Sequence, residues 1–148
     1  MDARIKELWV GQMPAFLDIA KDAYGKVKFM NQANAVQYCS AQGAHLPSAR
    51  ELAQLAMSLG AKGIVDSCGS ENKCYSVKAT NANGSSDSFN YSYAGYETPD
   101  GDLGKYWFWS SSVNSNYSDN AFYFIGDNGY VDNYYRNNFN AVLCVSGH

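Results

Sequence analysis

Histidine, positive charge and long apolar runs are all scarce in this chain of 148 residues. Its 11 Lys and Arg residues are outnumbered by 14 Asp and Glu residues, which gives a formal net charge of −3. Nucleic acids and anionic membrane surfaces attract basic proteins, so we expect neither as the main partner. No apolar stretch approaches the roughly 20 residues that a membrane-spanning helix needs, and we expect no membrane insertion.

Catalytic patterns are missing as well. The two histidines, His45 and His148, stand apart from any nucleophile elbow or carboxylate pair with a recognisable motif. None of the cysteine spacings gives the CxxC pair that is typical of zinc or redox sites. We therefore expect neither an enzyme nor a metal-binding motif, and we interpret His45, close to Pro47, as a structural hydrogen-bonding residue.

The four cysteines indicate disulfide bonds instead. Cys39, Cys68, Cys74 and Cys144 can pair in three ways. Cys68 and Cys74 are near enough in sequence to close a local loop, and in that case Cys39 would bond Cys144. Disulfides imply an oxidising compartment, so we expect a secreted or cell-surface protein. The alternative is four buried free thiols in a cytosolic protein.

The N-terminal region lacks the apolar core of a secretion signal, because Met1 leads directly into charged residues. We therefore expect the chain to be the C-terminal part of a longer exported protein. Asp2 to Ala23 has apolar residues at helical spacing, interrupted by Pro14. Residues 1–26 are expected to form a helical stub, either the end of a fibre shaft or a terminal helix docked on its own domain. Residues 27–148 would form one domain, with Val27 to Met30 as a candidate first strand.

Two amphipathic helices are predicted next. The first can be capped by Asn31 and should end at Gly43. The second begins with a capping box between Ser48 and Glu51 and ends near Gly60. Their apolar faces are formed by Ala35, Val36 and Cys39 in the first helix and by Leu52, Leu55, Ala56 and Leu59 in the second.

The last third of the chain has the alternation of β-strands. Ala121 to Gly126 places Phe122 and Phe124 on one face, and Asp127 to Gly129 supplies turn residues before Tyr130 to Asp132. This pattern predicts a β-hairpin. The final run, Ala141 to Val145, is short, apolar and β-branched, which favours a central strand.

Between these strands lie two polar segments, Val113 to Asn120 and Asn133 to Asn140, that are unusually rich in Tyr. Tyr with Ser and Asn is the composition of recognition loops, because a Tyr ring gives a large amphipathic contact at little entropic cost. The alternative is an ordinary Asn-rich turn region. We expect Trp107 and Trp109 to belong to the core beneath this surface. The candidate ligand-binding residues are Asn116, Tyr117, Asp119, Tyr130, Asp132, Asn133, Tyr134, Tyr135, Arg136, Asn137 and Asn138.

The order of several motifs resembles a known family. These motifs are Cys39 late in the first helix, the Leu46-Pro47 joint before a capped helix, the Trp109-Ser110-Ser111 segment, the Asn-Gly hairpin, and the Ala141 to Val145 strand. Together they look like the bacterial C-type-lectin-like family, which includes the C-terminal domains of collagen-like adhesins and paralogous surface proteins. The resemblance covers roughly residues 27–145.

The resemblance implies an α+β fold in which two helices flank small antiparallel sheets, the chain ends meet, and long irregular loops at one end bind ligand. It implies the tip of a secreted or surface fibre, with a glycan or a surface protein of another cell as partner. Because some relatives form trimeric fibre tips, it also implies a homotrimer.

The chain departs from the lectin pattern in two ways. It lacks the calcium motifs of animal lectins, and Leu143 stands where relatives often have an Arg that contacts ligand. We expect no cofactor, although aspartates in turns could place oxygens around a calcium ion. These aspartates are Asp100, Asp102, Asp119, Asp127 and Asp132.

Two other functions fit the same composition. Variable proteins of diversity-generating retroelements share this fold, and their diversified positions carry Asn, Tyr, Asp, Ser, Phe and Ile, as do many positions between residues 114 and 138. A structural module is the other alternative: a trimerisation or capping domain whose Tyr and Asn surface packs against sister subunits.

Overall fold

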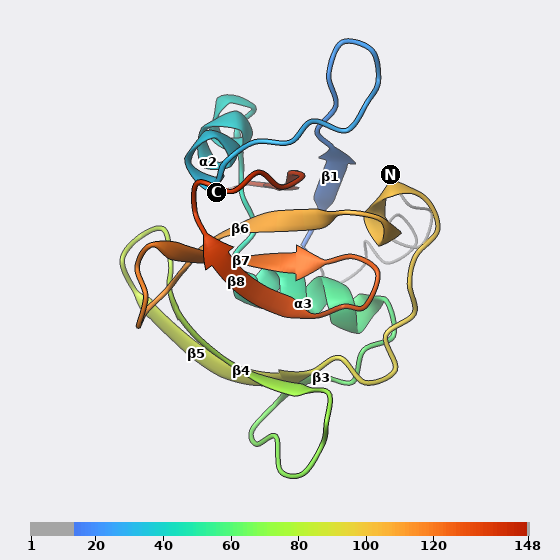
Figure 1. The fold of residues 1–148 in the computed structure, drawn as a ribbon, viewed down its shortest axis with the longest axis vertical. Helices are drawn as coiled ribbons and strands as arrows, with labels where there is room; N and C mark the ends of the chain where they lie inside the picture. The colour runs from blue at the N-terminus through green and yellow to red at the C-terminus, as the bar shows by residue number, and fades with distance from the viewer. Residues whose placement is uncertain (1–13, 148) are drawn as a thin grey trace.

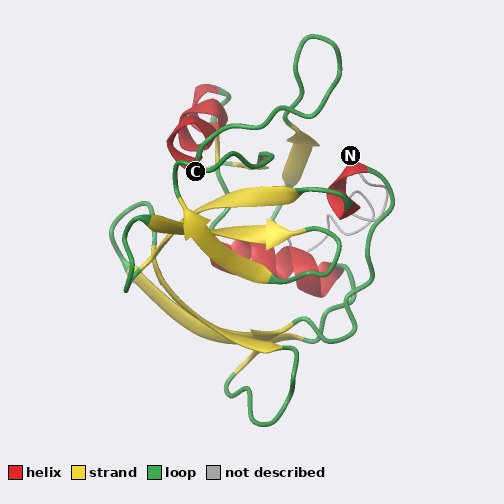
Figure 2. Ribbon diagram, viewed as in Figure 1, coloured by secondary structure: helices red, strands yellow, loops and turns green. Residues whose placement is uncertain are grey.

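The computed structural model describes residues 14–147, and these form an α+β fold (Figures 1 and 2). Two α-helices, one short 3₁₀ helix and nine strands make up the described part of the chain, and the strands belong to two antiparallel sheets. Two helices with antiparallel sheets are the coarse architecture that the sequence predicts.

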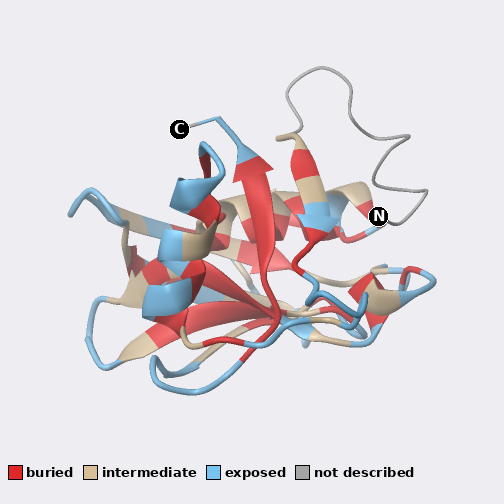
Figure 3. Cartoon of the chain, turned by 90° about the horizontal axis from the view of Figure 1, so that it is seen from above, coloured by how far each residue is buried: buried red, intermediate tan, exposed pale blue. Residues whose placement is uncertain are grey.

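The smaller sheet has the strand order β1-β9-β2, with β1 at Phe16–Ile19, β9 at Leu143–Ser146 and β2 at Ala44–His45. Both partners of β9 run antiparallel to it. The predicted central position of the final apolar run is therefore confirmed, and β9 is buried up to Val145 (Figure 3). Because β1 pairs with β9, the segment near the N-terminus lies beside the last strand.

The larger sheet has the strand order β3-β5-β4-β6-β7-β8. Its strands are β3 (Gly63–Val65), β4 (Cys74–Thr80), β5 (Ser86–Ser92), β6 (Trp107–Asn114), β7 (Asn120–Ile125) and β8 (Val131–Tyr135), with the 3₁₀ helix η1 (Asp102–Gly104) before β6. Strands β4 and β6 pair only at Ala79 with Asn114 and at Thr80 with Val113. The sheet bends at this short junction, and Figure 1 shows its two halves as separate layers.

Both predicted helices are present. Helix α2 (Gln32–Ala41) is capped by Asn31, and α3 (Ala49–Ser58) starts with the predicted capping box between Ser48 and Glu51. Helix α3 packs its Leu and Ala residues against Phe122, Phe124 and the β4–β5 strands. Helix α2 covers a second cluster with Trp109 and Tyr123. Strand β7 is thus apolar on both faces because each face meets a different core.

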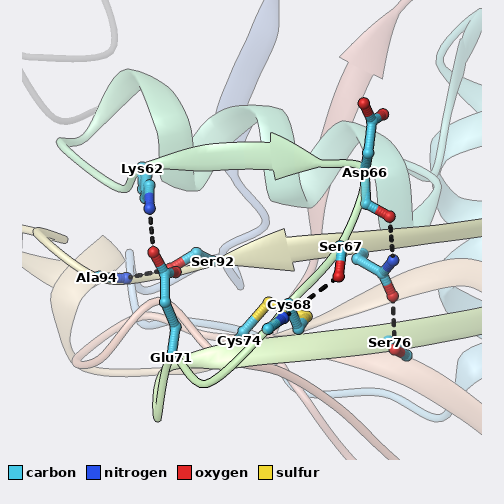
Figure 4. Close-up of a disulfide and its surroundings, with 11 residues drawn as sticks. Lys62, Asp66, Ser67, Cys68, Glu71, Cys74, Ser76, Ser92 and Ala94 are labelled. Carbon is cyan, nitrogen blue, oxygen red and sulfur yellow. Dashed lines mark hydrogen bonds and ion pairs between the residues drawn. A yellow bond between two sulfur atoms is a disulfide. The ribbon is translucent and has the colours of Figure 1, made fainter.

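Both disulfides form. Cys39 in α2 bonds Cys144 in β9, and Cys68 bonds Cys74 across the β3–β4 connection (Figure 4). A Lys62–Glu71 ion pair holds the small loop from outside. The long bridge ties a helix near the start of the described chain to its last strand, and the short one closes a local turn. This is the pairing predicted for the case in which Cys68 and Cys74 bond each other.

Three details of the N-terminal half differ from the predictions. Phe16–Ile19 is a strand and not part of a helix, because its backbone pairs with β9; an irregularity in the register between Phe16 and Ile19 lets both of these side chains face the core. Residues 1–13 of the expected stub lie outside the described residues, but Phe16 is fully buried in the main core. Residues 27–30 make only isolated bridges, and Val36 is exposed rather than internal.

Candidate functional site

The candidate surface is built from the β6–β7 loop (residues 115–119) and the end of β8 with the residues that follow it. The backbone N–H of Arg136 donates to the carbonyl of Asp119 at 2.9 Å, which joins the two segments. Three tyrosines are exposed here: Tyr117 at 68%, Tyr134 at 47% and Tyr135 at 56%. The rings of Tyr134 and Tyr135 lie 5.0 Å apart between centroids. We call this set of three residues the tyrosine surface.

A network of Asn side chains fixes the backbone beneath the tyrosine surface. The side-chain oxygen of Asn133 accepts from the amides of Asn114 and Asn120, both at 3.0 Å. The oxygen of Asn114 in turn accepts the backbone N–H groups of Asn116 at 2.9 Å and Tyr117 at 3.3 Å. The loop that carries Tyr117 is therefore held by hydrogen bonds to β6 and, through Asn133, to β8.

Arg136 also has a positioning role. Its Nε donates to Oε1 of Gln32 at 3.0 Å, while buried Gln32 donates from Nε2 to the carbonyl of Ser110 at 3.2 Å. The backbone carbonyl of Arg136 accepts from the N–H of Gln32. The segment after β8 is thus anchored to α2 and β6. Asp119, Tyr135, Arg136 and Asn137 line a cavity of about 340 Å³ at this place.

Strand β8 is an edge of the larger sheet, and three of its outward backbone groups have hydrogen-bond partners within the chain. The N–H of Val131 donates to the hydroxyl of Tyr91, and that of Asn133 donates to the Asp132 carboxylate at 2.8 Å. The carbonyl of Tyr135 accepts from the N–H of Asn138 at 3.1 Å. An edge occupied in this way resists pairing with another strand, so recognition here falls to side chains.

Most of the predicted site residues come together, but Tyr130 does not. It is half-buried, with its ring centroid 4.7 Å from that of Tyr75 and 5.1 Å from that of Tyr93. Burial raises the pKa of the Tyr130 hydroxyl. Tyr130 therefore closes the gap between β8 and the β4–β5 half of the sheet, and it does not display a ring to solvent.

The other predicted residues are placed as follows. Asn116, Asp119, Arg136, Asn137 and Asn138 are exposed around the tyrosine surface, whereas Asp132 and Asn133 are half-buried on β8. Asn133, Tyr134 and Tyr135 belong to a strand and not to a loop, because their backbones pair with Phe122, Ala121 and Asn120. Sequence reasoning missed Gln32 and Asn120 as positioning residues, because a polar side chain in a helix or strand carries no local sign of a distant partner.

The two tryptophans of this region differ from each other. Trp109 is fully buried and donates from Nε1 to the carbonyl of Met30 at 2.9 Å, as expected of a core residue. Trp107 is 46% exposed, so its prediction as a core residue is wrong. Strand β6 reaches the surface at its first residue, and the indole lies flat on Tyr123 with ring centroids 5.0 Å apart.

His45 has the structural contacts that were predicted for it. Its Nδ1 lies 2.8 Å from the carbonyl of Gly147, and its Nε2 lies 3.1 Å from both carboxylate oxygens of Glu51. Glu51 also accepts the N–H of Ser48 in the capping box. The ring therefore joins the start of α3 to the residues after β9.

In the part of the chain that the structure describes, no three His, Cys, Asp or Glu residues are arranged as a metal ion would require. Asp100 and Asp102, two of the aspartates considered for calcium, line one cavity with Asp18 and Lys21. Asp102 pairs with Lys21 at 3.6 Å, and Asp119 lies by the cavity near Arg136. No helix among residues 14–147 is long and apolar enough to cross a bilayer.

The geometry suits binding by contact and hydrogen bonding. Rings at the tyrosine surface offer flat amphipathic faces, and the amides and carboxylates around them offer donors and acceptors. Comparison of the chain with protein-family models, with curated protein sequences and with solved structures found no match.

Proposed function

We propose that this protein is a ligand-binding domain that recognises a glycan or another cell-envelope component through the tyrosine surface. The observation that carries the proposal is the exposure of Tyr117, Tyr134 and Tyr135 on a backbone fixed by hydrogen bonds. A cluster of large exposed rings marks an interaction site, whereas a single exposed ring does not. Because the frame is already ordered, binding would cost little conformational entropy.

The contacts would divide by chemistry. The tyrosine rings would stack on the apolar faces of sugar rings, and Asn116, Asn137 and Asn138 would hydrogen-bond hydroxyl groups. Asp119 and Arg136, which line one cavity with Tyr135, would receive the most polar group of the ligand. The side-chain bond of Arg136 to Gln32 orients the guanidinium without using all its donors.

Fold-level features support the C-type-lectin-like assignment within this proposal. The first and last described strands pair with each other, and the Cys39–Cys144 bridge joins the first helix to the last strand. Two disulfides also favour an exported protein. Display as the tip of a longer fibre is proposed on the family resemblance alone. Fold resemblance alone does not define a ligand, so the proposal rests on the surface.

The experiment is a binding screen of the oxidised domain on an array of bacterial and host glycans, with and without a calcium chelator. We expect specific binding that is unchanged by the chelator and lost in the Tyr134→Ala, Tyr135→Ala double variant. Tyr24→Ala is the matched control, since Tyr24 is 88% exposed in the turn between Lys21 and Val27.

Solution mass, measured on the same samples, tests the assembly alternative. A binding tip should keep its oligomeric state in the double variant. A lower mass in that variant, with no glycan bound by the parent protein, would contradict the proposal and assign the surface to subunit packing.

A further inference from the structure

Trp107 presents a flat ring to solvent on a rigid support. Its indole is stacked on Tyr123 with a centroid distance of 5.0 Å and an interplanar angle of 14°. Tyr123 is itself only 6% exposed, and it also packs edge-on against buried Trp109, with ring centroids 6.1 Å apart. One face of the Trp107 ring is thus covered by a fixed aromatic, while almost half of the side chain remains exposed.

The strand register places Trp107 on the same sheet face as two residues of the proposed site. Trp109 pairs with Tyr123, and Tyr123 pairs with Asp132, so these three side chains share one face. Trp107 precedes Trp109 by two residues and Tyr134 follows Asp132 by two, so both point to that face as well. Burial, followed by the charge of Asp132, raises the pKa of Tyr123 to about 12, which agrees with this placement.

The face crosses three neighbouring strands. Strand β7 lies between β6 and β8, and the β7 residues that pair with Trp107 and Tyr134 are Ile125 and Ala121, four positions apart. The two backbones are therefore separated by roughly 10 Å across the strands and by roughly 13 Å along them. Half-buried Asp132, on the strand of Tyr134, supplies a carboxylate acceptor on the same face. A single sugar ring is too short to contact both aromatic residues.

We infer that Trp107, Asp132 and Tyr134 form an extended subsite that binds an oligosaccharide of several sugar units across β6, β7 and β8. This inference rests on the proposed function and adds the length of its ligand. One sugar stacks on the exposed face of Trp107, another contacts Tyr134, and Asp132 accepts a hydroxyl hydrogen bond. The negative charge of Asp132 favours uncharged sugars over carboxylated ones at this place.

The test uses calorimetric titration with β-1,4-linked oligomers of glucose and of N-acetylglucosamine, from one to six units. We expect affinity for one of the series to rise with length and then level off once both aromatic residues are covered. Trp107→Ala should lower the affinity for the longer oligomers by about tenfold, while the shortest binding oligomer loses little. Trp107→Phe, which keeps a flat ring, should recover part of the loss, and thermal unfolding of each variant checks the fold.

The outcomes separate this inference from the proposed function. Equal affinity of Trp107→Ala and the parent at all lengths, with binding lost in the Tyr134→Ala, Tyr135→Ala variant, would overturn the extended subsite and leave the tyrosine surface in place. Binding that needs Trp107 but not the tyrosine pair would contradict both, because Tyr134 belongs to the extended subsite as well as to the tyrosine surface. If neither series binds at any length while array glycans do, the extended subsite is wrong.

Discussion

At the scale of single residues, Asn133 organises the candidate site although it is only half-exposed. Its side-chain oxygen is shared by Asn114 and Asn120, and the loop with Tyr117 depends on Asn114. An acceptor with two donors cannot be replaced by a side chain without an oxygen. Amide groups in recognition surfaces thus have two roles, since some contact ligand and others hold the backbone that displays it.

Replacement of Asn133 by Ala should lower the free energy of unfolding by about 1 kcal/mol, because two partly buried amide donors lose their acceptor. Chemical denaturation measures the change. Ligand affinity should also fall as the Tyr117 loop loosens. Asn138→Ala, at an exposed position, is the control and should leave stability within about 0.5 kcal/mol of the parent. Equal stability of Asn133→Ala and the control would show that the network does not hold the loop.

At the scale of elements, the bent sheet is closed by tyrosines. Tyr91 on β5 accepts the N–H of Val131 on β8, and Tyr75 on β4 packs on Tyr130 beside that strand. Burial raises the pKa of the Tyr91, Tyr75 and Tyr130 hydroxyls. The neutral forms of these side chains are therefore part of the folded structure.

Alkaline pH should open this closure. A tyrosine whose pKa is raised on folding contributes its full stability below the unfolded pKa of about 10, and this contribution is lost as pH rises through the folded pKa. From pH 7 to 9, ionisation of these tyrosines should therefore leave the free energy of unfolding unchanged. Above about pH 10, the free energy of unfolding should fall. Tyrosinate absorbance followed together with circular dichroism checks this.

Tyr91→Phe provides the comparison, because it removes one of the titrating groups. Its stability should be lower at neutral pH and should fall less steeply above about pH 10 than that of the parent. If all tyrosines ionised near pH 10 while the fold stayed intact, the claim that buried neutral tyrosines close the sheet would be contradicted.

The elements with local signals were predictable, and those set by distant contacts were not. The capping box of α3 and the turn before β8 each depend on residues that are close together in sequence, and both predictions were confirmed. Phe16–Ile19 has apolar spacing that fits a helix, and only pairing with β9 makes it a strand. Asn133 to Tyr135 are polar enough for a loop but continue β8, because β7 offers them a backbone to pair with. The exposure of Trp107 was likewise not predictable from the sequence, because it depends on how far the neighbouring elements extend over the start of β6.

At the scale of the whole molecule, two disulfides constrain the fold to different extents. The Cys39–Cys144 bridge spans 105 positions in sequence, and Cys68–Cys74 spans 6. In the chain-entropy model, the stabilisation grows with the logarithm of the closed loop. The long bridge should thus matter more, since it holds α2 against the last strand while the short bridge orders one turn.

Removal of the long bridge by Cys39→Ala and Cys144→Ala should cost about 5 kcal/mol, against about 2 kcal/mol for Cys68→Ala and Cys74→Ala. Denaturant unfolding of the two double variants gives the comparison. Equal losses, or a larger loss from the short bridge, would contradict the account of how the chain ends are held.

The central claim is that an ordered tyrosine surface binds ligand, and the most direct measurement is calorimetric titration of the strongest glycan from the array. It compares three proteins: the parent, the Tyr134→Ala, Tyr135→Ala double variant, and the Tyr24→Ala control. We predict that the double variant loses at least about tenfold in affinity while its thermal unfolding and mass stay those of the parent, and that the control binds normally. Equal binding by all three proteins would contradict the claim and place the ligand elsewhere on the domain.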